Sequence, residues 1–243
     1  MLSTPATHAP PVVAALTLDL DDTLWPIAPI MARCEQVLHD YLSEHAPIVA
    51  TRFPVPMMRA LRDRVFEERP ELAHDFATLR RLSLERAFDE CGHVSPAVID
   101  DAYALFYATR NEVQFYDEVA EALPAIARRH RIVALTNGNA DLGRIGLIDH
   151  FHGAVFAREF GCAKPDGRIF AHACALLDVE PAQVWHIGDD ADLDVVGAHQ
   201  AGLRTVWLNR DGRDWPYPDG PHPDLTVRDL VELDTWLAAH TSP

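Results

Sequence analysis

Residues 15–27 read ALTLDLDDTLWPI, an apolar run that ends in a cluster of acidic residues. Residues 12–18 are apolar except for one threonine and are too few for a stable helix, so they predict a strand buried on both faces. Four polar residues follow directly: Asp19, Asp21, Asp22 and Thr23. Three carboxylates so close together repel one another unless a cation lies among them. Because ligands bind at the carboxyl ends of parallel strands, this turn predicts a ligand site, with a solvated acidic turn as the alternative.

Beyond residue 117, short apolar runs alternate with amphipathic helical patterns. The apolar runs predict strands at residues 132–135, 154–156, 184–187 and 205–208. The helical patterns predict helices at 119–126, 166–177, 192–202 and 230–237, the second of them capped by Asp166. Strands that alternate with helices are typical of a parallel sheet covered by helices on both faces. The predicted fold class is therefore α/β.

Residues 28–110 have a different pattern, with helical spacing throughout and no strand signal. The apolar stripes predict four or so helices, in segments 31–46, 58–69, 72–90 and 96–106. Ser95 is expected to cap the last of these, with Pro96 at its first position. The predicted parts of the chain are a flexible tail at 1–10, a core at 11–27 and 111–243, and an all-helical insert at 28–110.

Composition narrows the classes of protein to which this chain can belong. The 243 residues carry a formal net charge of −16 and no block of lysine or arginine, which argues against nucleic-acid or anionic-membrane binding through the whole surface. The four cysteines form no C-x-x-C pair, as in a protein of a reducing compartment. No signal peptide and no membrane-spanning run is recognised. We expect a soluble cytoplasmic protein, a monomer or homodimer, with small molecules as partners.

Three later segments also follow predicted strands or precede helices. Residues 136–138, Thr-Asn-Gly, are either a turn that tolerates positive φ or a site where a hydroxyl and a backbone N–H hold phosphate oxygens. Lys164 is either a solvated lysine or a cation that balances a transferring phosphoryl group. Residues 186–194 read HIGDDADLD and place four carboxylates after a buried strand. Together with the first acidic turn, this loop indicates a site for a hard cation such as Mg²⁺.

The order of these segments resembles the four motifs of the haloacid dehalogenase (HAD) superfamily, whose members use an aspartate nucleophile. The matching patterns are D-x-D-x-T, then T-N-G, then K-P-D-x-x-x-F, then G-D-x-x-x-x-D, and they span residues 15–209. The helical insert between the first two motifs resembles the helical cap domain of that superfamily. The resemblance implies a Rossmann-like core and hydrolysis of phosphate esters with Mg²⁺ as the cofactor.

The resemblance also implies a role for each motif residue. Asp19 is similar to the nucleophile that forms an aspartyl-phosphate, and Asp21 to the general acid/base. The Asp19 carboxylate, the Asp21 backbone carbonyl and Asp189 would be Mg²⁺ ligands. Asp194 would steady that site, and whether Asp190 also contacts the metal stays open. The remaining motif residues are expected to contact the phosphate or balance its charge: Thr23, Thr136, Asn137, Gly138 and Lys164.

Two other functions use related sets of residues. Dehalogenases of the superfamily use the same nucleophile without the second carboxylate, because a halide leaves without a proton. The presence of Asp21 therefore favours phosphate esters over 2-haloacids. A response-regulator receiver domain also gathers acidic residues, a threonine and a lysine, but it is much shorter and has no helical insert.

The substrate is the least specified part of the prediction. The segments LDLDDTLW, TNGNA and HIGDD resemble bacterial HAD phosphatases that act on flavin mononucleotide and on the phosphorylated ribitylamino-uracil of riboflavin synthesis. Trp25, His74 and Arg80 are the expected contacts of the substrate, although His74-Asp75 is equally typical of a helix cap. Phosphoglycolate and small sugar phosphates are the alternative substrates, because phosphatases for them share the core motifs.

Overall fold

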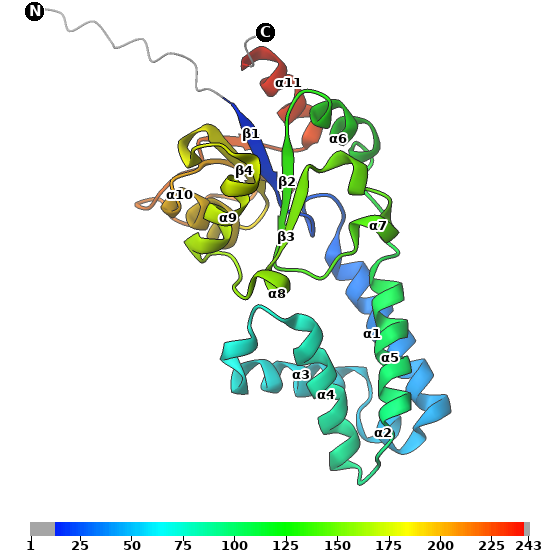
Figure 1. The fold of residues 1–243 in the computed structure, drawn as a ribbon. Helices are drawn as coiled ribbons and strands as arrows, with labels where there is room; N and C mark the ends of the chain where they lie inside the picture. The colour runs from blue at the N-terminus through cyan, green and yellow to red at the C-terminus, as the bar shows by residue number, and fades with distance from the viewer. Residues whose placement is uncertain (1–12, 241–243) are drawn as a thin grey trace, which may run out of the picture.

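The computed structural model describes residues 13–240, so the tail predicted at 1–10 lies outside the described residues. Figure 1 shows a sheet flanked by helices and, beyond one end of it, a separate group of helices. Within the described range, no helix combines the length and the apolar composition that crossing a membrane requires.

Six parallel strands form one sheet in the order β3-β2-β1-β4-β5-β6. The strands are β1 (Ala15–Leu18), β2 (Ile132–Thr136), β3 (Gly153–Phe156), β4 (Val184–Gly188), β5 (Arg204–Leu208) and β6 (Leu225–Val227). Leu16 of β1 pairs with Ile132 of β2 on one side and with Trp185 of β4 on the other. The strand order changes direction between β1 and β4, and ligands of such sheets bind at the carboxyl ends beside this point.

Helices cover both faces of the sheet because the central strands β1, β2 and β4 are buried at every position, so that both faces need covering. The covering helices are α6 (Val119–Ala127), α9 (Gly167–Leu177), α10 (Gly197–Gln200) and α11 (Leu230–His240), with short α7 (Leu142–Ile145) and α8 (Ala157–Phe160) beside them. Leu16 and Leu18 pack in one buried cluster with α6 and α11. Ala15, Val133 and Leu135 pack in a second cluster with α9 and α10. The predicted α/β fold with a parallel sheet is confirmed.

The helical group at residues 27–110 contains five α-helices where four or so were predicted. They are α1 (Ile27–His45), α2 (Pro47–Arg52), α3 (Val55–Glu68), α4 (Phe76–Glu90) and α5 (Pro96–Arg110). The additional helix arises because Pro47, expected only to end the first helix, occupies the first turn of α2, where proline is tolerated. Leu72 lies in a single 3₁₀ turn rather than in α4, and Ser95 makes no side-chain cap bond at the start of α5.

The chain crosses between the sheet and this helical group twice, and the two crossing segments lie side by side. The backbone N–H of Tyr116 donates to the carbonyl of Leu24 at 3.1 Å. The rings of Trp25 and Phe115 have centroids 6.1 Å apart. The first crossing leads into α1 and the second follows α5, so these two helices form the side of the group nearest the crossings (Figure 1).

Two further features differ from the predicted elements. β6 was not predicted, because it has only three residues and only Val227 among them is buried. The helix expected from Asp192 begins instead as a π-helical turn, Ala191–Val196, which α10 continues. The Asp190 carboxylate accepts hydrogen bonds from the backbone N–H groups of Asp192 and Leu193, both at 2.8 Å, and so caps that turn.

Candidate active site

The predicted motif residues meet where β1, β2 and β4 end. Asp19 follows the last residue of β1, Thr136 ends β2, and Asp189 follows the last residue of β4. The side chains face a cleft of about 430 Å³ that also has walls from α3, α4 and α5. The site therefore lies between the carboxyl edge of the sheet and the helical group.

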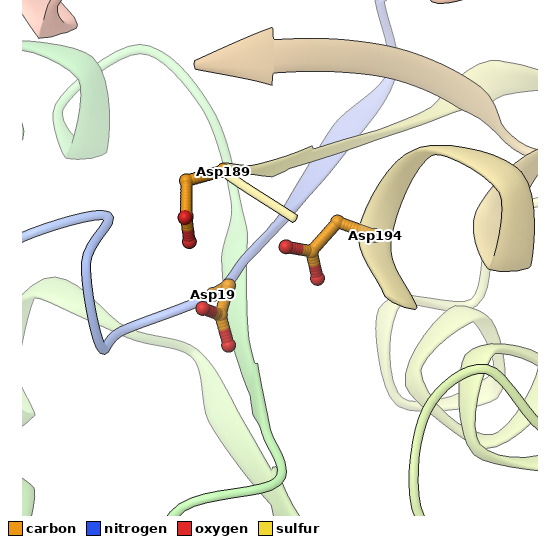
Figure 2. A group of neighbouring side chains, drawn as sticks. All are labelled: Asp19, Asp189 and Asp194. Atoms are coloured by element: carbon orange, nitrogen blue, oxygen red, sulfur yellow. The ribbon is translucent and has the colours of Figure 1, made fainter. Parts of the chain in front are cut away.

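Three carboxylates converge at the floor of this cleft (Figure 2). One oxygen from each of Asp19, Asp189 and Asp194 lies within 4.8 Å of the others. Burial raises the pKa of Asp19, and this effect outweighs the attraction of the Lys164 ammonium. Burial, followed by repulsion from Asp194 and neighbouring carboxylates, raises the pKa of Asp189 to about 7. A bound divalent cation would favour the ionised forms of both groups, and a set of carboxylate oxygens fits Mg²⁺.

Lys164 lies between two of these carboxylates. Its Nζ donates to Asp19 Oδ1 and to Asp194 Oδ1, each at 2.6 Å, and its side chain is buried. Burial alone would lower the pKa of Lys164, but the two carboxylates outweigh burial and raise it. For Asp194, burial would raise the pKa, but Lys164 and His186 hold it well below its usual range. Lys164 and Asp194 are therefore a charged pair.

The loop after β2 holds the backbone of Lys164 and lines the cleft. Asn137 accepts from the Lys164 backbone N–H at 2.8 Å and donates its side-chain N–H to the Lys164 carbonyl at 3.0 Å. The side-chain amide of Asn137 thus holds the lysine backbone, whereas a phosphate contact was expected. Thr136 Oγ1 accepts from the Gly138 N–H at 2.9 Å, and all three residues of this loop line the cleft.

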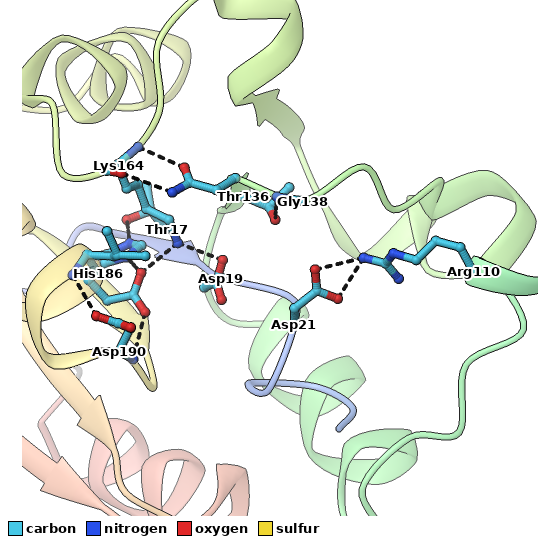
Figure 3. A network of polar contacts seen from close by, with 12 residues as sticks. Thr17, Asp19, Asp21, Arg110, Thr136, Gly138, Lys164, His186 and Asp190 are labelled. Carbon is cyan, nitrogen blue, oxygen red and sulfur yellow. Dashed lines mark hydrogen bonds and ion pairs between the residues drawn. The ribbon is translucent and has the colours of Figure 1, made fainter. Parts of the chain in front are cut away.

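Asp21 accepts hydrogen bonds from two side chains, Trp25 and Arg110, and Figure 3 shows the contact with Arg110. The Trp25 Nε1–H donates to Asp21 Oδ1 at 2.8 Å. The Arg110 Nη2 donates to both carboxylate oxygens at 2.7 Å. Trp25 is fully buried and does not line the cleft, which corrects the expectation that it contacts the substrate. Its indole is a support for Asp21.

Arg110 and His186 are site residues that the sequence reasoning missed. Arg110 ends an amphipathic helix, where an arginine is ordinarily solvated, yet only 2% of its surface is exposed. His186 lies inside β4 and bonds to Asp194 through Nε2 at 3.1 Å and to Thr17 Oγ1 through Nδ1 at 2.8 Å. Burial lowers the pKa of His186, and a neutral ring satisfies both contacts if Nε2 donates and Nδ1 accepts. The sequence did contain one signal for His186, namely a polar residue inside an otherwise apolar strand.

The outer wall of the cleft carries aromatic and cationic side chains of the helical group. Arg80 lines the cleft, and its Cζ lies 3.9 Å from the centroid of the Phe106 ring. Burial lowers the pKa of Arg80 to about 10, so it is charged at pH 7. Phe66 and Phe76 also line the cleft and stack with centroids 5.5 Å apart. Arg62 adds a second cation to this wall.

Two other expected substrate contacts lie away from the cleft. Thr23 is fully buried behind the first motif and is not among the described residues that line the cleft. His74 is also absent from that lining, and the adjacent Asp75 caps α4 by accepting from the Thr78 N–H at 2.9 Å. Asp75 also pairs with Arg158 of α8 at 3.3 Å. Of the two interpretations of His74-Asp75, the structure therefore supports the helix cap.

Known proteins resemble this chain along almost its whole length. A family model described as haloacid dehalogenase-like hydrolase matches residues 13–202. The 5-amino-6-(5-phospho-D-ribitylamino)uracil phosphatase YigB of Escherichia coli K12 is 30% identical over 232 residues, which cover 93% of this chain and 96% of that protein. A phosphoserine phosphatase of Thermus thermophilus is 32% identical over 228 residues, covering 87% and 80% of the two chains.

Solved structures agree with the family match. The crystal structure of a 2-haloacid dehalogenase from Pseudomonas syringae superposes with a TM-score of 0.86 at 35% identity, and the match covers 94% of this chain and 99% of that one. The dehalogenase thus shares its architecture with this protein. With the family model matching most of the chain and the motif residues gathered in one cleft, this protein is an enzyme that belongs to the haloacid dehalogenase-like hydrolase family.

Proposed function

We propose that the protein is a Mg²⁺-dependent phosphomonoester hydrolase that works through an aspartyl-phosphate on Asp19. The observation that carries this proposal is the second carboxylate, Asp21, held at the mouth of the site by Arg110 and Trp25. A phosphate ester needs a proton donor for its leaving alkoxide, and Asp21 supplies one. The carboxylates of Asp19 and Asp189 would hold Mg²⁺, which supplies positive charge to the phosphate oxygens when bound.

Each step of the reaction has a residue of this chain to perform it. An oxygen of Asp19 forms a bond to phosphorus while the bond from phosphorus to the leaving oxygen breaks, and Asp21 gives that oxygen its proton. Asp21 then takes a proton from water as the water oxygen bonds to phosphorus and the bond to Asp19 breaks. Lys164 would balance the charge of the nucleophile, and the Thr136 hydroxyl, which lines the cleft, would donate to a phosphate oxygen. The net result is an alcohol, phosphate and the original enzyme.

For the substrate we propose flavin mononucleotide or a related ribityl or sugar phosphate. The relative YigB is a phosphatase for a ribitylamino-uracil phosphate, and it matches nearly the whole chain. Phe66 and Phe76 offer flat apolar contacts in the wall of the cleft, and Arg80, stacked on Phe106, offers a cation beside them. A ring with carbonyl oxygens, joined by a flexible chain to a phosphate, suits such a wall.

A second candidate, hydrolysis of 2-haloacids, is favoured by the similarity to the Pseudomonas syringae dehalogenase. That reaction requires a carboxylate nucleophile but no proton for the departing halide, so it gives Asp21 no role. The arrangement of donors around Asp21 therefore supports the phosphatase. Phosphoglycolate and small sugar phosphates remain the alternative substrates within the phosphatase proposal.

A panel of substrates tests the proposal and its alternatives. Purified enzyme is assayed with flavin mononucleotide, sugar phosphates, phosphoglycolate, nucleotides and 2-chloropropionate, with Mg²⁺ and with excess chelator. We expect phosphate release from flavin mononucleotide that disappears with chelator and returns with Mg²⁺. A kcat/KM about tenfold higher for phosphoglycolate or a hexose phosphate, about 1.4 kcal/mol of transition-state preference, would overturn the flavin assignment alone. Chloride release from chloropropionate that resists the chelator would favour the dehalogenase.

A further inference from the structure

Arg110 makes contacts that are unusual for the last residue of a surface helix. It ends α5, its surface is 2% exposed, and its Nη2 donates to both oxygens of Asp21 at 2.7 Å. Its Nε donates to Asn139 Oδ1 at 3.3 Å. Its Nη1 is buried without a hydrogen-bond partner. A buried cation with an unsatisfied donor destabilises the fold, so its presence calls for a functional explanation. Arg110 also lines the cleft.

The two carboxylate oxygens of Asp21 accept different numbers of hydrogen bonds. Oδ1 accepts from both Trp25 and Arg110, whereas for Oδ2 the described residues supply Arg110 alone. Oδ2 also lies against the loop after β2: a β-carbon added to Gly138 would be 2.4 Å from it. A carboxylate oxygen accepts about two hydrogen bonds. Oδ2 therefore keeps one lone pair that accepts no hydrogen bond from the described residues. Any side chain at position 138 would collide with this oxygen, so the arrangement requires glycine there.

We propose that Arg110 is the positioning residue for Asp21, holding the carboxylate so that Oδ2 is the atom that exchanges the proton with the substrate. This inference rests on the proposed phosphatase function. In the first half of the reaction, Oδ2 gives its proton to the leaving alkoxide. In the second half, Oδ2 takes a proton from the attacking water. Arg110 keeps all of its protons and acts only through orientation.

The predicted consequence is a loss that depends on the leaving group. A leaving alcohol of high pKa needs the proton, whereas an acidic phenol departs without it. If Arg110 positions the proton donor, then Arg110→Met should lower kcat much more for flavin mononucleotide than for p-nitrophenyl phosphate. A residue with only a structural role would lower activity on both esters by the same factor.

The chain offers a matched control at the same end of α5. The Arg33 guanidinium donates to the carbonyls of Thr109 and Glu112, which flank Arg110 in the chain, and does not contact Asp21. Arg33→Met thus removes an arginine that ties down the same segment without touching the acid/base. Both variants and the wild type are assayed with the two esters at saturating Mg²⁺, and folding is checked by circular dichroism and thermal midpoint.

We expect Arg110→Met to lose at least about tenfold more kcat on flavin mononucleotide than on p-nitrophenyl phosphate, and Arg33→Met to show no such difference. Equal losses of Arg110→Met on both esters, or the same selectivity in Arg33→Met, would overturn the inference. If Arg110→Met folds poorly, Arg110→Lys keeps the buried charge, and a smaller loss of the same selectivity is expected. A wild type that releases phosphate from neither of these esters nor from any other ester of the substrate panel would instead refute the proposed function together with this inference.

A double-mutant comparison decides whether Arg110 acts through Asp21. In an Asp21→Asn background the proton donor is absent, so adding Arg110→Met should leave the ratio of the two kcat values unchanged. A further selective loss on flavin mononucleotide in that background would show that Arg110 acts directly on the substrate and would overturn its assignment as a positioning residue.

Discussion

Asp19 is the side chain on which the proposed chemistry depends, because its carboxylate is to carry the phosphoryl group. An amide oxygen is a much weaker nucleophile, so Asp19→Asn should abolish phosphate release from any phosphomonoester. The amide still offers an acceptor to the Lys164 ammonium, which lies 2.6 Å from Oδ1 in the wild type, so the variant should stay folded. Steady-state assays with circular dichroism check both expectations. A folded Asp19→Asn protein with appreciable turnover would refute the mechanism.

The sequence identified a site residue when the residue belonged to a short motif, and missed it when its role depends on contacts between distant segments. Asp19 and Asp21 were recognisable because they end one apolar strand and belong to one short motif. Arg110 was not, because whether a helix-terminal arginine is solvated or buried depends on which segment folds against it. Trp25 was assigned to the substrate because an aromatic residue near a motif looks exposed to the ligand. Its indole is instead enclosed, since the second crossing segment packs on it through Phe115.

At the scale of an element, the cap of α4 gives a quantitative expectation. Asp75 accepts from the backbone and hydroxyl of Thr78 at 2.9 and 2.6 Å, and Asp75→Ala removes both bonds. Loss of an N-cap lowers the free energy of unfolding by about 1 kcal/mol, measurable by urea denaturation. Arg158→Ala is the matched control, because it removes only the exposed ion pair of Asp75 and should change stability by less than about 0.5 kcal/mol. Equal effects of the two variants would contradict the cap.

The same carboxylate gives this prediction a pH dependence. Burial would raise the pKa of Asp75, but its hydrogen bonds to Thr78 outweigh burial and lower the pKa from its ordinary value of 3.8. A group with a lowered pKa in the folded state stabilises the fold above its unfolded-state pKa and loses that contribution as the pH falls through the folded-state pKa. The difference between wild type and Asp75→Ala should therefore be complete at neutral pH and shrink below about pH 4. A difference in the free energy of unfolding between the two proteins that stays the same in acid would contradict a role for the ionised Asp75 carboxylate.

Predicting the elements succeeded where each had a clear apolar period. The strands around β1 and the long helices of the insert have many buried positions, so their patterns are strong. β6 escaped because one buried residue in three gives no period, and α2 escaped because Pro47 both ends α1 and begins the next helix. The π-helical turn depends on Asp190 capping two backbone N–H groups, a contact that periodicity does not express.

For the whole molecule, charge predicts how substrates approach. The net charge of −16 repels a phosphate ester at long range, while the cations Arg62, Arg80 and Lys164 act only inside the cleft. Salt screens charges beyond about 8 Å at 0.15 M ionic strength. Raising NaCl from about 20 to about 150 mM should therefore raise kcat/KM about twofold and leave kcat nearly unchanged, at constant free Mg²⁺. A fall in kcat/KM would show that the cleft cations dominate the approach.

The order of the motifs was enough to predict a parallel core interrupted by a helical insert. It did not predict how the insert faces the core, because that depends on pairs far apart in the chain. Arg110 with Asp21 and Arg158 with Asp75 are two such pairs. This orientation decides which residues form the wall of the cleft. Arg80 lines the cleft, whereas His74, which was expected there, does not.

The paired crossings between sheet and helical group have a consequence for the range of substrates. Two adjacent connections, bonded from Tyr116 to Leu24, would set one short axis for any rotation of the helical group against the sheet. Asp21 lies three residues before Leu24, so rotation displaces it little. Phe66 of α3 and Phe76 of α4 lie farther from this axis, on the side where α8 is nearest to the helical group in Figure 1 and where Asp75 pairs with Arg158, so they move more than Asp21 once that ion pair opens. The protein should therefore accept leaving alcohols of different sizes while the groups around the phosphate stay in place. Among related enzymes, the range of substrates and the rate of the reaction would then change independently.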